Sequence, residues 1–336
     1  MNKELLFNLY AIHSPSGGEK KMRKFIKRYI AQNCGEVEVV QDALGNLLCT
    51  KGVSDTYPCL ASHIDQVQHK HSRDFVCIES QGVVFGFSPK CREQQGLGAD
   101  DKNGIYICLE CLKKYDVLKV AFFVGEEVGC VGSSDVDLTF FKDCRFIVEP
   151  DRKGHADLIT SMFCGEVCSP EFIAAIGGDK FGYREEHGSI TDVGELVERG
   201  VGISCLNLSC GYYEAHTDQE FTVLSELENC HHFVETIIET CSDVFPFEYV
   251  DRWGYYNGYG GYFGGFHHYD EEYWNGGYYD EDFDMMTEIL HSRPGMTFEE
   301  VSTDYGINFY THRMSELEEI YNDVKALMRD EKKKVS

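Results

Sequence analysis

The stretch 118-LKVAFFVGEEVG-129 places two adjacent glutamates directly after a short apolar run. Runs of this length are typical of buried strands, and the polar residues that follow them mark the strand end. The same arrangement occurs at 57-YPCLASHID-65, which ends in a histidine and an aspartate, and at 144-CRFIVEPD-151, which ends in two acids. Three predicted strands therefore each place polar, potentially catalytic side chains at their carboxyl ends.

Helical patterns alternate with strands over the first 245 residues. Residues 18–33 are amphipathic, residues 101–115 have a helical pattern after a loop, and residues 225–240 predict a last helix. Residues 37–51 predict a hairpin. This alternation predicts an α/β fold with a mixed, mostly parallel sheet and helices on both faces. In such sheets ligands bind beyond the strand ends.

The charge of the chain is strongly negative. Its 336 residues include 57 acidic and 31 basic side chains, a formal net charge of −26. This surplus repels nucleic-acid backbones and anionic membrane surfaces, so we expect no nucleic-acid or membrane partner. No apolar run approaches the roughly 20 residues that span a bilayer, and the first residues lack a signal-peptide pattern. A cytoplasmic protein is therefore expected.

The 15 cysteines are odd in number and scattered through apolar contexts. This favours reduced, buried thiols over a disulfide framework. Cys108 and Cys111 form a C-x-x-C pair within a helical pattern and have no second pair nearby. We interpret them as core residues and not as zinc ligands.

Residues 247–284 differ in composition from the rest of the chain. They contain nine tyrosines, eight glycines and nine acids, with one arginine as the only fixed positive charge. Without periodicity and with little aliphatic content, they predict a low-complexity linker, which is a candidate for self-association. The expected organisation is a folded domain over 1–246, the linker over 247–284 and a small helical tail over 285–336.

Five short segments place histidine or carboxylate side chains at predicted strand ends or in loops. They are SHIDQV (62–67), GADDKNG (98–104), VGEEVG (124–129), VEPD (148–151) and EAHTDQE (214–220). Two imidazoles and several carboxylates without a thiolate are a ligand set for zinc, cobalt or manganese.

Spacing within two of these segments suggests different roles for neighbouring side chains. His63 and Asp65 lie two residues apart on a strand and share a face, so Asp65 can accept a hydrogen bond from the imidazole and fix the tautomer that binds metal. Glu126 and Glu127 point in different directions at a bend, so one can bind a metal while the other acts as general base.

Together these motifs resemble the dinuclear zinc exopeptidases and amidohydrolases, which include peptidase T, carboxypeptidase G, aminoacylase and the glutamyl aminopeptidases. The resemblance runs in the family's order from SPSGGE (14–19) to HTDQE (216–220), roughly the first 240 residues. It implies a metallopeptidase-like catalytic domain over 1–246. It also implies two divalent metal ions, zinc before cobalt or manganese.

The resemblance further implies a role for each matching residue. Asp100 would bridge both metals, and the family's peptide bond at Asp100–Asp101 is typically cis. Glu126 would be the general base, and Asp65 would support the catalytic site from behind a ligand. The other ligands would be His63 for one metal, and Glu127 with His216 for the second.

The remaining ligand is either Glu149 or Asp151. Alignment on Glu-Pro favours Glu149, whereas alignment on Asp-Arg-x-Gly favours Asp151. We expect Asp151, because it follows Pro150, where the strand should already have opened into an active-site loop.

Many relatives insert a lid or dimerisation domain before the last ligand. Only 64 residues separate Asp151 from His216, too few for a full lid, so the resemblance is to a lidless version. The segment 178–196 resembles an active-site loop of lidless relatives. Its candidate substrate contacts are Tyr183, Arg184, Ser189, Thr191 and Asp192. The alternative is a solvent loop capped by Ser189 or Thr191.

These features predict a metal-dependent hydrolase that removes a terminal residue from a short peptide, as an aminopeptidase or a di- or tripeptidase. Two alternatives remain open. The same chemistry would serve an N-acyl amino acid deacylase or other small amidohydrolase, and an inactive relative would act as an interaction protein.

Overall fold

The computed structural model describes residues 1–162 and 165–250, together with Thr297 and Lys325. The chain divides into two compact units, Met1–Gly265 and Phe266–Ser336, and nearly all of the described residues belong to the first. The predicted linker beyond residue 250 and the predicted helical tail, apart from Thr297 and Lys325, lie outside the described residues.

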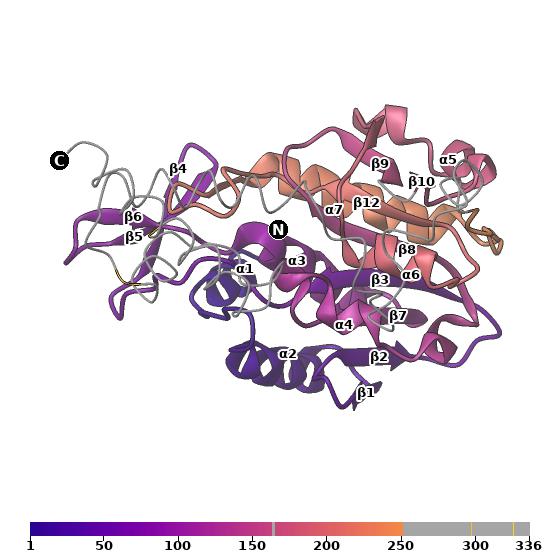
Figure 1. Cartoon of the computed structure of the whole chain (residues 1–336), viewed down its shortest axis with the longest axis horizontal. Helices are drawn as coiled ribbons and strands as arrows, with labels where there is room; N and C mark the ends of the chain where they lie inside the picture. The colour runs from indigo at the N-terminus through magenta and orange to yellow at the C-terminus, as the bar shows by residue number, and fades with distance from the viewer. Residues whose placement is uncertain (163–164, 251–296, 298–324, 326–336) are drawn as a thin grey trace. The chain divides into compact units, whose positions relative to one another are not determined.

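A mixed nine-stranded sheet forms the centre of the described part of the first unit (Figure 1). Its strands are β1 (Val37–Gln41), β2 (Leu47–Lys51), β3 (Tyr57–His63), β7 (Leu118–Phe123), β8 (Cys144–Arg152), β9 (Asp157–Met162), β10 (Gly165–Glu166), β11 (Arg184–His187) and β12 (Cys205–Ser209). The order is β1-β2-β7-β3-β8-β12-β9-β10, with β11 paired to β9. The central strands β7, β3, β8 and β12 run parallel, whereas β1 and β2 pair antiparallel at one edge. This is the mixed sheet with a parallel centre that the sequence predicts.

Helices cover both faces of this sheet. Successive side chains of a strand point to opposite faces. Val120 and Phe122 accordingly belong to one hydrophobic core, and Ala121 and Phe123 belong to the other. The first core includes residues of α1 (Lys3–Tyr10), α2 (Lys20–Asn33), α3 (Ala99–Lys114), α5 (Pro170–Ile176) and α7 (Leu224–Thr240). The second includes residues of α6 (Asp192–Glu198), which packs against α4 (Val131–Ser134), and of the 3-10 turn η2 (Leu138–Phe141).

Helix α2 shows why the sequence pattern was informative. Met22, Ile26 and Ile30 recur every four residues and are buried, as expected for the apolar stripe of a surface helix. Its remaining positions carry six lysines and arginines.

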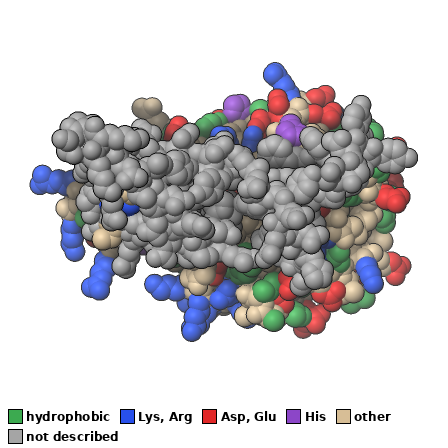
Figure 2. Space-filling model, in the orientation of Figure 1, with side chains coloured by type: hydrophobic (Ala, Val, Ile, Leu, Met, Phe, Trp, Pro, Cys, Tyr) green, Lys and Arg blue, Asp and Glu red, His purple; other side chains and the backbone are tan. Residues whose placement is uncertain are grey.

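Figure 2 shows basic side chains along the lower and left edges of the visible face and acidic side chains toward its right end.

The sequence patterns did not predict a second, five-stranded antiparallel sheet. Its strands are β4 (Val76–Ser80), β5 (Val83–Ser88), β6 (Glu93–Gln95), β13 (Tyr212–Tyr213) and β14 (Phe221–Val223). β5 pairs with β14, which lies far along the chain, and β13 contacts α3. This long-range pairing brings the HTDQE loop, which connects β13 to β14, near α3.

The predicted elements lie close to their expected bounds. The helices predicted at 18–33, 101–115 and 225–240 are α2, α3 and α7, and the hairpin at 37–51 is β1 with β2. The segment between Asp151 and His216 contributes strands to the main sheet, as expected for a chain without a full lid domain.

One expectation about β8 is wrong. The strand does not open at Pro150 but continues to Arg152. Its register against β12 shifts here, so that two residues of β8 lie opposite one residue of β12. Such a bulge accommodates a proline, because a residue left out of the ladder needs no N–H donor.

Most of the described cysteines are buried, as the sequence predicts, whereas Cys77 is half-buried and Cys91 is exposed. Cys108 and Cys111 are fully buried in the first core, and none of the described cysteines forms a disulfide. Within the described residues, no helix is both long and apolar enough to cross a membrane.

Candidate metal centre

The predicted segments meet at one edge of the central sheet. β3 ends at His63, β7 leads into the 3-10 turn η1 (Glu126–Val128), and β8 carries Asp151 near its end. Because these strands are parallel, their carboxyl ends share one edge. Asp100 at the start of α3 and His216 in the β13–β14 loop lie at the same place.

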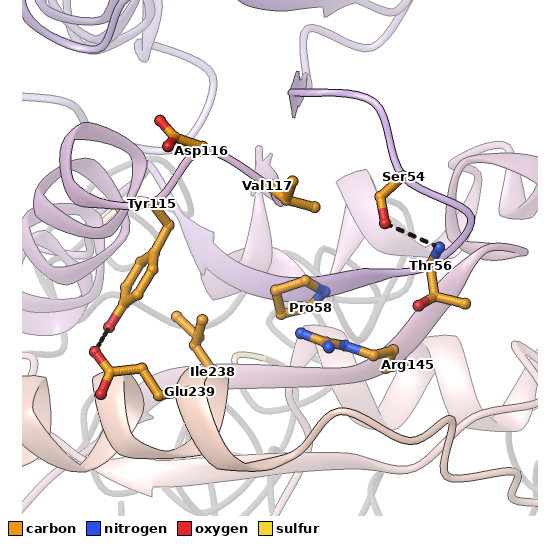
Figure 3. Close-up of a pocket in the computed structure, with 9 residues that line it drawn as sticks. All are labelled: Ser54, Thr56, Pro58, Tyr115, Asp116, Val117, Arg145, Ile238 and Glu239. Carbon is orange, nitrogen blue, oxygen red and sulfur yellow. Dashed lines mark hydrogen bonds between the residues drawn. The ribbon is translucent and has the colours of Figure 1, made fainter.

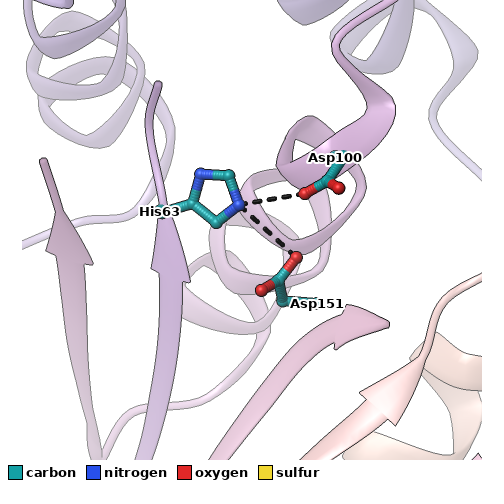
Figure 4. A group of neighbouring side chains, drawn as sticks. All are labelled: His63, Asp100 and Asp151. Atoms are coloured by element: carbon teal, nitrogen blue, oxygen red, sulfur yellow. Dashed lines mark hydrogen bonds and ion pairs between the residues drawn. The ribbon is translucent and has the colours of Figure 1, made fainter. Parts of the chain in front are cut away.

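His63, Asp100 and Asp151 form the first cluster of potential metal ligands (Figure 4). His63 Nε2 lies 3.0 Å from Asp100 Oδ1 and 3.4 Å from Asp151 Oδ1. All three side chains are buried. The potential ligand atoms lie within 4.8 Å of one another, so one cation can contact all three.

Asp100, Glu127 and His216 form the second cluster. His216 Nε2 lies 3.0 Å from Glu127 Oε2 and 3.2 Å from Asp100 Oδ2. The two carboxylate oxygens of Asp100 therefore face different clusters, which is the geometry of a bridging ligand. His216 has a φ of 64°, uncommon for a non-glycine residue and typical of functional sites. The Asp100–Asp101 peptide bond is cis, as the resemblance implies.

The structure places Asp151, and not Glu149, beside His63. In a regular strand the two acids would share a face, but the bulge at β8 separates them. Glu149 is buried and accepts a hydrogen bond from the Thr191 hydroxyl. Asn207 holds the backbone of Asp151, because its Oδ1 accepts from Asp151 N (3.0 Å) and its Nδ2 donates to Asp151 O (2.9 Å).

Asp65 connects three parts of the site. Its Oδ2 accepts a 2.7 Å hydrogen bond from the Ser16 hydroxyl, and its Oδ1 accepts a 3.1 Å bond from the Glu126 backbone N–H. The Nδ1 of His63 lies 3.4 Å from Oδ1, longer than a normal hydrogen bond. Asp65 thus lies behind His63, where the sequence expects it, while its contacts with Ser16 and Glu126 were not predicted.

Glu126 and Glu127 differ in position although they are adjacent. Gly125, with a φ of 63°, turns the chain from β7 into η1. Glu127 belongs to the second cluster, whereas Glu126 lines the pocket beside the clusters and belongs to neither. Burial, with the charges of Asp151 and Glu127, raises the pKa of Glu126 well above its usual value. A carboxylate with a raised pKa is a better proton acceptor.

The residues present fit divalent metal ions. Burial and nearby acids raise the pKa values of Asp151 and Glu127. The Oε1 atom of Glu127 is buried and has no hydrogen-bond partner among the described residues. Crowded carboxylates with an unsatisfied oxygen need a cation or protons. The donor set of imidazole nitrogens and carboxylate oxygens suits zinc, cobalt or manganese.

Removing metal is expected to reverse the pH dependence of stability between pH 5 and 7. In the metal-free fold, burial raises the pKa values of Glu126, Glu127 and Asp151, and Asp100 and Glu127 raise that of His216 to about 10. These groups bind protons more tightly when folded, so the stability of the metal-free protein should decrease as the pH rises. Metal binding requires deprotonated ligands, so the stability of the loaded protein should increase over the same range.

Calorimetry of chelator-treated and zinc-loaded protein at pH 5, 6 and 7 measures this difference. A change of 1 kcal/mol corresponds to roughly 2–4 °C in Tm for a domain of this size. We expect the Tm of the metal-free protein to fall by at least roughly 2–4 °C between pH 5 and 7. Parallel Tm profiles for the two forms would contradict the ligand assignment.

Both clusters contribute to the wall of a pocket of about 750 Å³, a size typical of small-ligand sites. Of the predicted substrate contacts, Ser189 and Thr191 line this pocket. Thr191 stands at the N-cap position of α6, but its hydroxyl bonds to Glu149 and not to the helix backbone.

The structure does not bring Tyr183, Arg184 or Asp192 into the pocket wall. The Tyr183 hydroxyl is buried and donates a 2.6 Å hydrogen bond to a backbone carbonyl of β12. Arg184 is exposed on β11. Asp192 starts α6 and points into the protein interior, where it accepts a 2.5 Å bond from a serine of α4. The resemblance marked the right loop, but the packing of α6 and β11 decides which of its side chains reach the pocket.

A buried polar network behind Asp100 was not predicted. Glu220 Oε1 accepts from the Asp100 backbone N–H (3.2 Å), and its Oε2 accepts from Gln68 Nε2 (3.3 Å). Gln68 Oε1 accepts from Gln66 Nε2 (3.1 Å), and Gln66 Oε1 accepts from Lys102 Nζ (2.6 Å). All of these side chains are buried. Each of these residues lies within or next to one of the five metal-ligand segments of the sequence. Their polar side chains at these positions were the sequence feature that could have predicted the network.

Glu220→Gln is expected to weaken metal binding by roughly 10- to 100-fold, the usual effect of losing a residue that orients a ligand. A lysine only donates and a carboxylate only accepts, so the network has one direction from Lys102 to Glu220. Both oxygens of Glu220 accept hydrogen bonds, whereas a glutamine side chain has one oxygen and one NH2 group. In the variant the NH2 group therefore faces another donor, either Gln68 Nε2 or the Asp100 backbone N–H. Zinc competition with a chelating dye measures the affinity, with the exposed Glu36→Gln as control. Unchanged affinity would show that Glu220 does not position Asp100.

A second pocket of about 350 Å³ lies at the opposite edge of the sheet (Figure 3). It is lined by Pro58 near the start of β3 and by Val117 just before β7. The Tyr115 hydroxyl at its wall donates a 2.7 Å hydrogen bond to Glu239. None of the potential metal ligands found among the described residues lines this second pocket.

Solved structures share this fold, whereas no protein-family model and no curated protein matches the sequence. The aminopeptidase PepT from Bacillus cereus ATCC 10987 is 16% identical, with a TM-score of 0.56 over 71% of this chain and 97% of that chain. A tripeptidase from Staphylococcus aureus subsp. aureus Mu50 is 15% identical, with a TM-score of 0.58 over 70% and 96%. The Pyrococcus horikoshii TET1 peptidase, which can assemble into a tetrahedron or a large octahedral shell, is 17% identical, with a TM-score of 0.51 over 70% and 98%.

These likenesses cover nearly the full length of the three solved chains. The share of this chain that they cover is close to the length of the predicted domain 1–246. The chain therefore has the fold of the PepT aminopeptidase and the TET1 peptidase, which confirms, at the level of the fold, the resemblance found in the sequence.

Proposed function

We propose that this protein is a dinuclear metal-dependent exopeptidase. The observation that supports this most strongly is the position of Asp100, whose two oxygens face separate clusters, each completed by one histidine and one further carboxylate. His63 and Asp151 would hold one ion, Glu127 and His216 the other, and Asp100 both. Zinc is the first candidate, with cobalt or manganese as alternatives.

The ions of such a site supply Lewis acidity and lower the pKa of water. Glu126 then accepts a proton from the attacking water and returns it to the leaving amine, a role consistent with its raised pKa and its place in the pocket wall. Asp65 orients His63 and Glu126, because it lies behind the His63 ring and accepts a hydrogen bond from the Glu126 backbone N–H.

The proposed substrate is a short peptide that loses a terminal residue. The pocket volume suits a ligand of a few residues. Solved structures with this fold include an aminopeptidase and a tripeptidase. Hydrolysis of an N-acyl amino acid by the same site is the alternative, since it requires the same attack on an amide carbonyl.

A substrate panel with zinc- or cobalt-loaded protein tests this proposal. It contains aminoacyl amides, dipeptides, tripeptides and N-acetyl amino acids, with a chelator-treated sample as control. Hydrolysis that requires a free α-amine supports an aminopeptidase, and hydrolysis of acylated substrates supports the deacylase. Absence of bound divalent metal in protein incubated with these ions would overturn the proposal.

We also propose self-association, with the linker 247–284 as the first candidate surface. The TET1 peptidase, which shares the fold, forms large assemblies. Light scattering of the full chain and of a variant ending at residue 250 tests this. If particles of the two proteins contain the same number of chains, the linker is excluded as the contact.

A further inference from the structure

Three basic side chains follow the ligand candidate Asp151 and line the same pocket. They are Arg152, Lys153 and His155. Positive charge beside a metal centre weakens cation binding. These side chains therefore indicate a different ligand, one that carries negative charge.

The backbone that carries the basic side chains is held in place. Lys153 O accepts a 2.7 Å hydrogen bond from the Ser209 hydroxyl. Gly154 N donates to Tyr212 O (2.8 Å), and Gly154 O accepts from Gly211 N (2.8 Å). The φ of Gly154 is 81°, which favours glycine at this turn. The backbone of the basic segment is therefore a fixed part of the wall, and a ligand bound there does not have to order it.

Two of the three basic side chains already have partners. Arg152 Nε donates to Asp157 Oδ2 (3.2 Å), and His155 Nδ1 lies 2.9 Å from the Tyr213 hydroxyl. Lys153 is exposed, and its ammonium makes no hydrogen bond or ion pair within residues 1–162 and 165–250. The charge of Lys153 is therefore free to meet a ligand in the pocket.

The spacing between Lys153 and the metal centre matches a short peptide. Lys153 lies two residues after Asp151, so their Cα atoms are at most roughly 7 Å apart. A lysine ammonium reaches roughly 6 Å from its Cα. Each residue of an extended peptide adds roughly 3.5 Å. If the scissile peptide bond lies at the first cluster, a side chain or terminus of the peptide one or two residues away is within reach of the Lys153 ammonium.

We infer that Lys153, with Arg152 and His155 beside it, binds a carboxylate of the substrate and makes this site select short peptides that carry one. The inference rests on the proposed peptidase function. An ammonium–carboxylate contact is a charge-assisted hydrogen bond, which is stronger than a neutral one. The carboxylate is either the C-terminus of the peptide or an acidic side chain near the scissile bond.

Three peptide ligands separate these two sources. They are Ala-Ala-Ala, its C-terminal amide, and Glu-Ala-Ala amide, each titrated calorimetrically into full-length, zinc-loaded Glu126→Gln protein. We expect at least one carboxylate-bearing peptide to bind about tenfold more tightly than Ala-Ala-Ala amide, the effect of one charge-assisted hydrogen bond. A preference for Ala-Ala-Ala identifies the C-terminus, and a preference for Glu-Ala-Ala amide identifies the side chain.

Variants at Lys153 test the residue itself. In the same background, Lys153→Met should reduce the preference to nearly one, and Lys153→Arg should restore most of it. Lys180→Met is the matched control, because Lys180 is exposed on η3 (Gly178–Phe181) and does not line the pocket. Equal affinity for all three peptides, or a preference that survives Lys153→Met, would overturn the inference.

Wild-type hydrolysis separates this inference from the proposed function. Hydrolysis of all three peptides with equal kcat/KM leaves the proposed function standing and overturns the inference. A Lys153-dependent binding preference in a protein that hydrolyses none of the peptides supports the carboxylate site and overturns the proposed reaction.

Discussion

Glu126→Gln is expected to lower kcat by between about 10² and 10⁴-fold while the protein keeps its metal. The raised pKa of Glu126 suits its carboxylate to accept a proton from water. The amide of the variant cannot accept that proton. Glu126 belongs to neither ligand cluster, so its replacement leaves the coordinating atoms in place. Its backbone N–H, which donates to Asp65, is also unaffected. Steady-state kinetics and elemental analysis of the same preparation measure both effects.

The adjacent Glu127 is the matched comparison for Glu126. Glu127→Gln removes a charged member of the second cluster, so we expect reduced metal content together with reduced activity. The two variants differ by one position in sequence, yet only one should retain full metal. A Glu126→Gln protein that stays active would show that another group is the general base.

Asp100→Ala is expected to remove both metals, the largest change in metal content that one substitution can cause at this site. Its two carboxylate oxygens face the His63 and His216 clusters separately, so its loss leaves each cluster with one histidine and one carboxylate. His216→Ala affects only the second cluster, and His63→Ala only the first. Elemental analysis should therefore find nearly no metal in Asp100→Ala and intermediate content in each histidine variant.

Folding of the Asp100→Ala variant can be checked independently. Hydrogen bonds from His216 and His63 lower the pKa of Asp100 despite its burial, so it is charged in the metal-free fold beside other acids. Removing that charge relieves repulsion with Glu127 and Asp151, which offsets part of the loss of the contacts with His63 and His216. The variant should give the circular dichroism spectrum of the chelator-treated wild type. Full metal content in Asp100→Ala would exclude a bridging role.

The sequence was most informative where a pattern is local. The period of apolar residues predicted α2, α3, α7 and the central strands, because side-chain direction repeats every 3.6 residues in a helix and every two in a strand. His63 and Glu127 could be placed at the sheet edge for the same reason. The carboxyl ends of parallel strands meet there whatever the loops do.

Non-local packing decided what those patterns left open. The bulge opposite β12 turned Asp151 and Glu149 to different partners, although they are two residues apart on one strand. Pairing of β5 with β14 placed His216, and the interior position of α6 removed Asp192 from the pocket. These outcomes depend on contacts between segments far apart in the chain, which no single window of sequence contains.

The sequence by itself determined the chemical inventory of this protein: an α/β fold whose strand ends and loops carry two histidines and several carboxylates. Only the tertiary structure decided how that inventory is arranged, with Asp100 between two clusters, Glu126 outside both and Lys153 in the pocket wall. The physical reason is that residue types and local periods fix which groups reach the strand ends. The distances between those groups are set by strand register, a bulge and a second sheet, all of which are long-range contacts.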